Sequence, residues 1–163
     1  MDFKTADLCD EFGGELEVSS YEFKSYGKKQ KFYGPIETLK VFEDNVLVRK
    51  ALETVPPGTL LVVDGGGSRR CALLGDRLGE IAQNRGLAGI IINGCVRDTE
   101  DLVKLDIGIL ALGSNPLKSN KEGKGEQGVA LTFGGLTLSP GDYVYADTDG
   151  VVAAKKDVLS ITL

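Results

Sequence analysis

Two continuous apolar runs with an amphipathic segment between them constrain the fold more than any other feature of this sequence. Residues 60–63 (LLVV) and residues 88–93 (AGIIIN) are apolar runs of the kind found in strands covered on both faces. Between them, residues 75–85 carry apolar side chains at helical spacing and end before Gly86, which suits a helix terminus. Strand, helix and strand in this order predict a βαβ unit and therefore an α/β fold.

Segments on either side extend this unit. A helix is expected over residues 5–12 with Thr5 as its N-cap, and another after Asp44 or Asn45 that stops before Pro56 and Pro57. Strands are expected over residues 35–42 and 107–112, irregular strands within 21–34, and antiparallel hairpins in the last third of the chain. No repeat, linker or low-complexity tract interrupts residues 1–163, so a single domain is expected.

Residues 114–128 (SNPLKSNKEGKGEQG) are rich in Gly and Lys, which favours a mobile loop or an interface arm. Glu126 within it is expected to be solvated. Asp142, Asp147 and Asp149 stand beside turn residues, so hairpin geometry is favoured for them over a weak cation site.

The composition excludes several classes of chemistry. There is no histidine among the 163 residues, which removes Ser-His-Asp and Cys-His nucleophile systems and nearly every catalytic zinc site. The net charge of -5 offers no electrostatic footprint for nucleic acid or an anionic membrane, so neither is expected as a partner. Chemistry would have to use carboxylates, Arg, Lys, Tyr, backbone amides or a hard metal ion.

Cysteine use and the N-terminal residues bear on the compartment. Cys9, Cys71 and Cys95 are too few for an all-cysteine zinc site and odd in number for a disulfide framework, so reduced core thiols are expected. The first ten residues carry acids where a secretory signal has a basic region, and no apolar run is long enough to span a membrane. These features predict a cytoplasmic protein.

The glycine-rich segment DGGGS, residues 64–68, invites a nucleotide-loop interpretation. It has neither the GxxxxGK[ST] spacing nor the G-x-G-x-x-G fingerprint, and Arg69 and Arg70 follow where a helix would have to start. A tight structural turn is the favoured interpretation, with the lining of a neighbouring anion site as the alternative.

The βαβ unit itself offers a second candidate site. Asp76 opens the predicted helix, and a turn at Gly94 would deliver Arg97 and Asp98 just past the end of the next strand. Ligands of α/β sheets bind outside the carboxyl ends of strands, where a helix N-terminus offers free N–H groups. The spacing alone leaves a second interpretation open, in which Arg97 and Asp98 form a surface ion pair and Asp76 only complements the helix dipole.

Motifs along almost the whole chain resemble those of one family. The segments that carry the resemblance are LCD at 8–10, FEDN at 42–45, VVDGGGS at 62–68, GIIINGCVRD at 89–98, DIG at 106–108 and YADTDG at 145–150. The family contains the class II 4-hydroxy-4-methyl-2-oxoglutarate aldolases and the regulator of ribonuclease activity A. The resemblance implies a three-layer ββα sandwich like the swivelling phosphohistidine-type domains, assembled as a homotrimer that can pair further, with sites at subunit interfaces.

The aldolase branch of that family carries an acid, twenty intervening residues and then Arg-Asp, a pattern matched here by Asp76, Arg97 and Asp98. By resemblance, Gly75, Asp76, Arg77 and Leu78 would bind the substrate carboxylate, Arg97 would contact the substrate, and Asp98 would ligate a divalent ion. Mg²⁺ is favoured for that ion over Mn²⁺ or Co²⁺. Asp76 and Arg97 would be the catalytic residues.

The chemistry implied is carbon–carbon bond cleavage in 4-hydroxy-4-methyl-2-oxoglutarate-type keto acids, which leaves a pyruvate enolate stabilised by the ion and Arg97. Asp76 would position or deprotonate a water molecule that takes the hydroxyl proton. Oxaloacetate decarboxylation passes through the same enolate and should accompany the lyase activity. A Schiff-base lysine is disfavoured because no lysine lies near the crevice on the βαβ elements.

The main rival function is inhibition of an RNase E-type endoribonuclease, which needs an acidic surface but not Asp76, Arg97 and Asp98 together. A methyltransferase, another activity attached to the family, is disfavoured because residues 64–68 lack a cofactor fingerprint. A surface and a crevice do not exclude each other, so the lyase and regulator functions could coexist.

Overall fold

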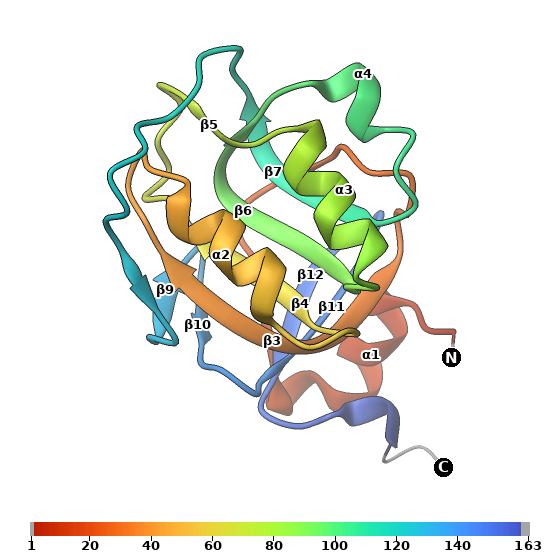
Figure 1. Ribbon diagram of the computed structural model, residues 1–163. Coiled ribbons are helices and arrows are strands. Elements are labelled where there is room, and N and C mark those ends of the chain that lie inside the picture. Colours follow the sequence, from red (N-terminus) through yellow and green to blue (C-terminus); the bar gives the residue numbers. More distant parts are fainter. Residues whose placement is uncertain (1, 161–163) are drawn as a thin grey trace.

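The computed structural model describes residues 2–160 and has a mixed α/β fold built on one large sheet (Figure 1). The helices are α1 (Thr5–Phe12), α2 (Val46–Thr54), α3 (Asp76–Asn84) and α4 (Thr99–Leu102), with 3-10 turns at Gly13–Glu15 and Val158–Ser160. The strands are β1 (Leu16–Val18), β2 (Lys24–Ser25), β3 (Phe32–Lys40), β4 (Leu60–Asp64), β5 (Ala72–Leu74), β6 (Gly89–Val96), β7 (Gly108–Ser114), β8 (Glu126–Gln127), β9 (Leu131–Phe133), β10 (Leu136–Leu138), β11 (Tyr143–Asp147) and β12 (Gly150–Ala154).

The sheet runs in the order β1-β12-β11-β3-β4-β6-β7-β2, and its central strands β3, β4, β6 and β7 are parallel. Strand β3 belongs to both halves. Residues Phe32 to Pro35 pair antiparallel with β11, whereas Ile36 to Lys40 pair parallel with β4. The sheet therefore changes from antiparallel to parallel within one strand.

Three layers result, as the predicted ββα sandwich requires. Helices α2 and α3 cover one face of the parallel strands, and the antiparallel strands lie behind the other face (Figure 1). Strand β4 shows why a continuous apolar run was needed: Leu61 and Val63 pack toward the helices, while Leu60 and Val62 pack toward the antiparallel layer. Both faces of the strand are buried, so alternation with polar residues is absent.

Helix α1 adds a smaller layer outside the antiparallel strands. Its residues Leu8 and Phe12 pack with Tyr145 and Val152 on the outer face of β11 and β12. The prediction that Thr5 caps this helix is wrong, because Lys4 occupies the N-cap position and Thr5 is the first helical residue. The Asp147 carboxylate performs the capping instead, accepting the Thr5 N–H at 2.7 Å and its hydroxyl at 2.6 Å.

Most predicted elements are confirmed with shifted ends. The helix of residues 76–84, the strand of residues 60–64 and the hairpins β9–β10 and β11–β12 are present. The predicted turn at Gly94 is wrong, because β6 continues to Val96 through an irregularity in its pairing with β7 between Ile92 and Cys95. The apolar pair Cys95 and Val96 is buried, which accounts for the longer strand.

The turn chemistry expected for the acids is confirmed at Asp142 and Asp147, and the expected solvation is confirmed at Glu126. Asp142 accepts the Ser139 N–H at 2.9 Å, Asp147 accepts the Asp149 N–H at 3.0 Å, and Glu126 is exposed. Cys71 and Cys95 are buried free thiols, and burial raises the pKa of each. Cys9 differs from the prediction because it is only half-buried. Across residues 2–160, every helix is too short or too polar to cross a bilayer.

Candidate functional site

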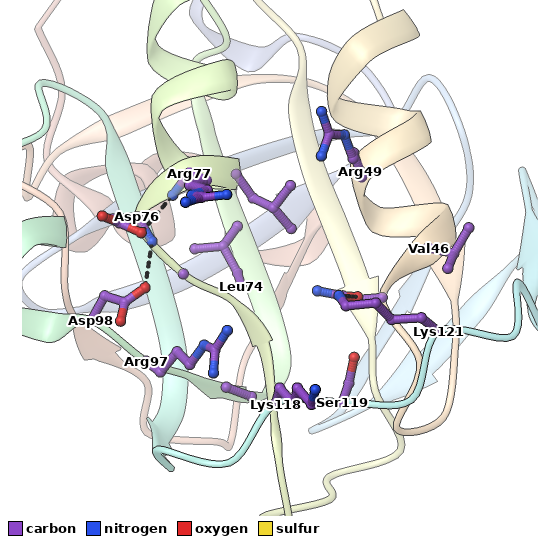
Figure 2. A pocket seen from close by; sticks show the side chains of 14 residues that line it. Val46, Arg49, Leu74, Asp76, Arg77, Arg97, Asp98, Lys118, Ser119 and Lys121 are labelled. Atoms are coloured by element: carbon purple, nitrogen blue, oxygen red, sulfur yellow. Dashed lines mark hydrogen bonds between the residues drawn. The ribbon is translucent and has the colours of Figure 1, made fainter.

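A pocket of about 670 Å³ opens at the carboxyl end of the parallel strands, between the first turns of α2 and α3 (Figure 2). All six residues singled out from the sequence line it: Gly75, Asp76, Arg77, Leu78, Arg97 and Asp98. Residues that the sequence did not single out complete the wall: Asn45, Val46, Arg49, Ala72, Leu74, Lys118, Ser119 and Lys121. The volume lies in the range typical of small-molecule sites.

Short strand β5 brings the two ends of the βαβ unit together. It pairs with the last residues of β6, and the Arg97 N–H donates to the Leu74 carbonyl at 2.9 Å. Helix α3 follows β5 directly, so the start of α3 lies against the residues after β6. The Asp76 N–H then donates to Asp98 Oδ2 at 3.0 Å, which joins the first residue of the helix to the end of the strand.

The backbone at Asp98 is unusual. Its φ of 58° lies in the left-handed region, which a residue other than glycine adopts only at a conformational cost. Gly75 makes room for this arrangement, since a Cβ at that position would meet Asp98 Oδ2 and press on the Arg97 side chain. The left-handed backbone of Asp98 directs its side chain toward the helix N-terminus, and the lack of a side chain at Gly75 leaves room for it there.

The N-terminus of α3 supplies N–H groups to this space. The Asp76 N–H is taken by Asp98, and the Arg77 N–H donates to Asp76 Oδ1 at 2.9 Å. The Leu78 N–H has no partner within residues 2–160 and remains to donate to a bound anion. The helix terminus and two guanidinium groups, Arg77 and Arg97, therefore surround the carboxylates.

The segment of residues 115–125, here called the lysine loop, forms another wall of the pocket. Of the two predicted alternatives, a mobile loop or an interface arm, the first does not fit, because the buried Asp44 carboxylate accepts the N–H groups of Glu122 at 2.7 Å and Gly123 at 3.0 Å. Burial alone would raise the pKa of Asp44, but the hydrogen bond from the Val46 N–H, together with these bonds from the loop, lowers it. The loop is fastened to the start of α2.

The lysine loop brings lysines to the pocket, although none of the lining residues on the βαβ elements is a lysine. Lys118 and Lys121 line the pocket, and the Lys121 ammonium donates to Asn45 Oδ1 at 2.9 Å. Sequence reasoning searched only the βαβ elements, whereas these lysines arrive from a loop that follows β7. The only signal in the sequence was the density of lysines in residues 114–128.

The glycine-rich turn after β4 lies outside the pocket lining. Asp64 Oδ1 accepts the Gly66 N–H at 2.9 Å and the Asn93 side-chain amide at 3.0 Å, and the N–H groups of Gly65 and Gly67 donate to the Asn93 carbonyl. Gly66 and Gly67 adopt positive φ. The interpretation as a tight structural turn is confirmed.

The carboxylates of the pocket bear on which ion it could hold. No cluster of three or more His, Cys, Asp or Glu side chains suited to a metal occurs in the described part of the chain. Two carboxylates, Asp76 and Asp98, adjoin open space. Mg²⁺ is usually held by one or two protein carboxylates, with water and substrate oxygens completing its ligands, so this donor set fits it. It does not fit a structural zinc ion, which needs a full set of protein ligands.

Comparisons with known proteins agree with the fold and its motifs. A Bacillus cereus protein provisionally named a 4-hydroxy-4-methyl-2-oxoglutarate aldolase is 56% identical over 156 residues, covering 96% of this chain and 98% of its own. An Arabidopsis thaliana protein with the same provisional name is 51% identical over 161 residues, covering 96% of this chain and 97% of its own.

Two solved structures match closely. One, from Geobacillus kaustophilus, is described as an S-adenosylmethionine: 2-dimethylmenaquinone methyltransferase; it has a TM-score of 0.96 and 63% identity, covering 97% of this chain and 98% of that one. The other is the RNA-processing inhibitor RraA from Thermus thermophilus, with a TM-score of 0.92 and 47% identity over 96% of this chain and 94% of that one.

The model of one family, described as RraA-like with the members aldolase and RraA, matches residues 5–153, which span every element that builds the pocket. With this match and relatives above 50% identity over nearly their whole length, the chain belongs to the RraA-like family.

Proposed function

We propose that this protein is a divalent-metal-dependent lyase that cleaves 4-hydroxy-4-methyl-2-oxoglutarate-type keto acids to pyruvate, with oxaloacetate decarboxylation as a side activity. The observation that carries the proposal is the convergence of Asp76, Arg97 and Asp98 on one pocket at a helix N-terminus. The provisional names of relatives at 51% and 56% identity point to the same reaction.

Asp98 would hold the ion, for which Mg²⁺ is the favoured candidate, and Asp76 lies beside it. When bound, the ion would act as a Lewis acid toward the keto oxygen of the pyruvyl half. Asp98 can serve in this way because its Oδ2 is oriented by the Asp76 N–H, and its other oxygen has no partner within residues 2–160.

The remaining steps use groups of the chain. The Leu78 N–H receives the substrate carboxylate, with the Arg77 side chain beside it on the pocket wall, and the Arg97 guanidinium stabilises the negative charge that develops on the keto oxygen. Asp76, through an intervening water, takes the proton of the C4 hydroxyl. The C3–C4 bond breaks, its electron pair enters the enolate, and protonation at C3 gives pyruvate, while the C4 half leaves as the second carbonyl product. From oxaloacetate the same enolate forms with loss of carbon dioxide.

A Schiff-base mechanism through Lys118 or Lys121 is a poorer fit. Both lysines are exposed, whereas a lysine nucleophile is usually activated by burial in a desolvated, apolar setting. Borohydride trapping in the presence of substrate should give no adduct on either lysine; a trapped adduct would replace the metal-dependent mechanism.

The test of the proposed function is pyruvate release from 4-hydroxy-4-methyl-2-oxoglutarate and from oxaloacetate, with Mg²⁺ and with EDTA. Wild-type protein should release pyruvate with Mg²⁺ alone, and Asp98→Ala should abolish release without loss of the folded state measured by circular dichroism. A folded wild-type protein that releases no pyruvate above background would refute the lyase function.

A second candidate function is regulation of an RNase E-type endoribonuclease, because the RraA structure from Thermus thermophilus is 47% identical. The two functions separate experimentally. Inhibition through a surface should survive Asp98→Ala, whereas pyruvate release should not. A methyltransferase is not proposed, because the glycine-rich turn closes on Asn93 and takes no part in the pocket lining.

We further propose a homotrimer, in a cytoplasmic setting, on the basis of family membership alone. Large apolar side chains at Phe42 and Leu117 are 57% and 61% exposed, which is consistent with burial against another subunit. Light scattering after size-exclusion chromatography should give about three times the chain mass of 17.4 kDa. A mass equal to that of the single chain would contradict the trimer.

A further inference from the structure

The pocket carries an excess of positive charge although the whole chain is acidic. Its lining includes the cationic side chains Arg49, Arg77, Arg97, Lys118 and Lys121 but only two carboxylates, Asp76 and Asp98. The complete chain has a net charge of -5. A cavity with this local excess attracts anions of more than one charge better than a monoanion.

The positive charges are spread across the pocket from the carboxylates to α2 (Figure 2). Arg77 and Arg97 lie beside Asp76 and Asp98, where the proposed chemistry takes place. Lys118 and Lys121 come from the lysine loop, and Lys121 lies on the opposite side of the view from Asp76 and Asp98, toward α2. Lys121 is therefore displaced from the carboxylates, and Lys118 lies between it and Arg97, so positive charge continues beyond the place proposed for the pyruvyl half.

The charges of Lys118 and Lys121 are not neutralised. Within residues 2–160 neither takes part in an ion pair, and Lys121 donates only to the neutral Asn45 amide oxygen. Arg49, by contrast, lies 3.5 Å from the Glu53 carboxylate. The two lysines thus have donors free for a ligand, while part of the charge of Arg49 is already compensated.

The backbone that carries these lysines is held at several points. The Ala72 N–H donates to the Leu117 carbonyl at 2.8 Å, and the Asn120 N–H donates to the Glu43 carbonyl at 2.8 Å. Between them, Ser119 is 6% exposed. Together with the Asp44 anchor, these bonds present the lysines at fixed places on the pocket wall, which reduces the entropy lost when a ligand binds.

We propose that Lys118 and Lys121 form a subsite for the distal carboxylate of the substrate, so that the pocket selects 2-oxo acids with a second carboxylate at the far end of the chain. The inference rests on the proposed function, because it places the pyruvyl end of the substrate at Asp76 and Asp98. It adds a reason for the pocket volume of about 670 Å³, which exceeds the needs of pyruvate alone.

The test compares two ligands that cannot be cleaved because they lack a C4 hydroxyl. 2-Oxoglutarate and 2-oxopentanoate have the same chain length, and a methyl group replaces the distal carboxylate in the second. Isothermal titration calorimetry of the wild-type protein with Mg²⁺ should show at least tenfold tighter binding of 2-oxoglutarate, a preference of about 1.4 kcal/mol. The affinity for 2-oxopentanoate gives the contribution of the pyruvyl end by itself.

Removal of the two charges should remove the preference. The variant Lys118→Gln/Lys121→Gln should bind both ligands within about threefold of each other, with the affinity for 2-oxopentanoate unchanged. The matched control is Lys124→Gln on the same loop, because Lys124 pairs with Glu122 at 3.1 Å and does not line the pocket. It should keep the wild-type preference.

Each result has a defined meaning. Equal affinity of the wild-type protein for the two ligands, no binding of either, or a preference that survives in the double variant would overturn the subsite. Pyruvate release from 4-hydroxy-4-methyl-2-oxoglutarate, measured in parallel, tests the proposed function separately. A preference that depends on both lysines, without any pyruvate release, would keep the dicarboxylate subsite and refute the lyase.

Discussion

Asp98 Oδ2 accepts the backbone N–H of Asp76 at 3.0 Å, across a sequence separation of 22 residues. One oxygen of the Asp98 carboxylate is thereby committed to the start of α3. This bond fixes the direction in which the carboxylate presents its remaining lone pairs, and it makes Asp98 both a structural link and the expected ligand for the ion.

The substitution Asp98→Asn should separate these roles. The amide oxygen of Asn can still accept the Asp76 N–H, so the melting temperature should change little, but the negative charge that attracts a divalent ion is lost. Mn²⁺ binding, followed by electron paramagnetic resonance, should weaken by at least tenfold, together with loss of pyruvate release. Unchanged Mn²⁺ affinity would show that Asp98 is not the ligand.

The variant Gly75→Ala should impair the site although it replaces none of the charged side chains there. The new Cβ would meet Asp98 Oδ2, so the carboxylate or the helix start must shift, and activity should fall by at least tenfold. Gly14→Ala is the matched control, since its Cβ would meet nothing within 4 Å. If Gly75→Ala retains wild-type activity and metal affinity, the close approach has no functional role.

The anchor of the lysine loop gives a third prediction. Asp44→Ala removes the acceptor for the N–H groups of Val46, Glu122 and Gly123, and should destabilise the protein by about 1–3 kcal/mol. Hydrogen exchange at Glu122 and Gly123 should accelerate far more than exchange at the amides of β4. A uniform acceleration across the chain would indicate global destabilisation and no separate release of the loop.

A fourth prediction concerns acid stability at Asp147. Burial opposes the charged carboxylate, but the hydrogen bonds from the Thr5 hydroxyl and N–H outweigh it and lower the pKa of Asp147. A carboxyl with a depressed pKa in the folded state contributes stability above its unfolded pKa of about 3.9, and this contribution is lost as the pH falls through the folded pKa.

Asp147→Asn should therefore lower the free energy of unfolding by about 1 kcal/mol at neutral pH and reduce its decline below pH ~4. Urea unfolding at a series of pH values measures both effects. Asp149→Asn, in the same exposed turn, is the control and should follow the wild-type curve. Parallel curves for Asp147→Asn and the wild type would exclude the carboxylate as the titrating group.

The layers and the βαβ unit could be predicted because their signals are local. The apolar run of β4 and the periodicity of α3 reflect burial of both faces of a strand and of one face of a helix. The end of β6 was predicted too early because Gly94 resembles a turn residue. Its neighbours Cys95 and Val96 are buried against β5, a strand too short to show a pattern of its own.

The pocket could be predicted only in part. Asp76, Arg97 and Asp98 lie on elements whose sequence pattern is clear, so their meeting follows from the topology. Lys118 and Lys121 lie on a loop whose place depends on hydrogen bonds from its backbone to Asp44, some 80 positions away. Hydrogen bonds from a carboxylate to distant backbone N–H groups leave no periodic pattern in the sequence. For this reason the lysine loop, which Asp44 holds in place, had the sequence features of a mobile loop.

The divided pairing of β3 has a consequence for any attempt to dissect the protein. Because the first residues of β3 complete the antiparallel half and its last residues complete the parallel half, neither half keeps all its strands if the chain is cut between them. The pocket lies on the parallel half of the molecule. It therefore depends on β3, whose first residues are held by pairing with β11 in the antiparallel half. Fragments that contain only the pocket-bearing elements should fail to fold.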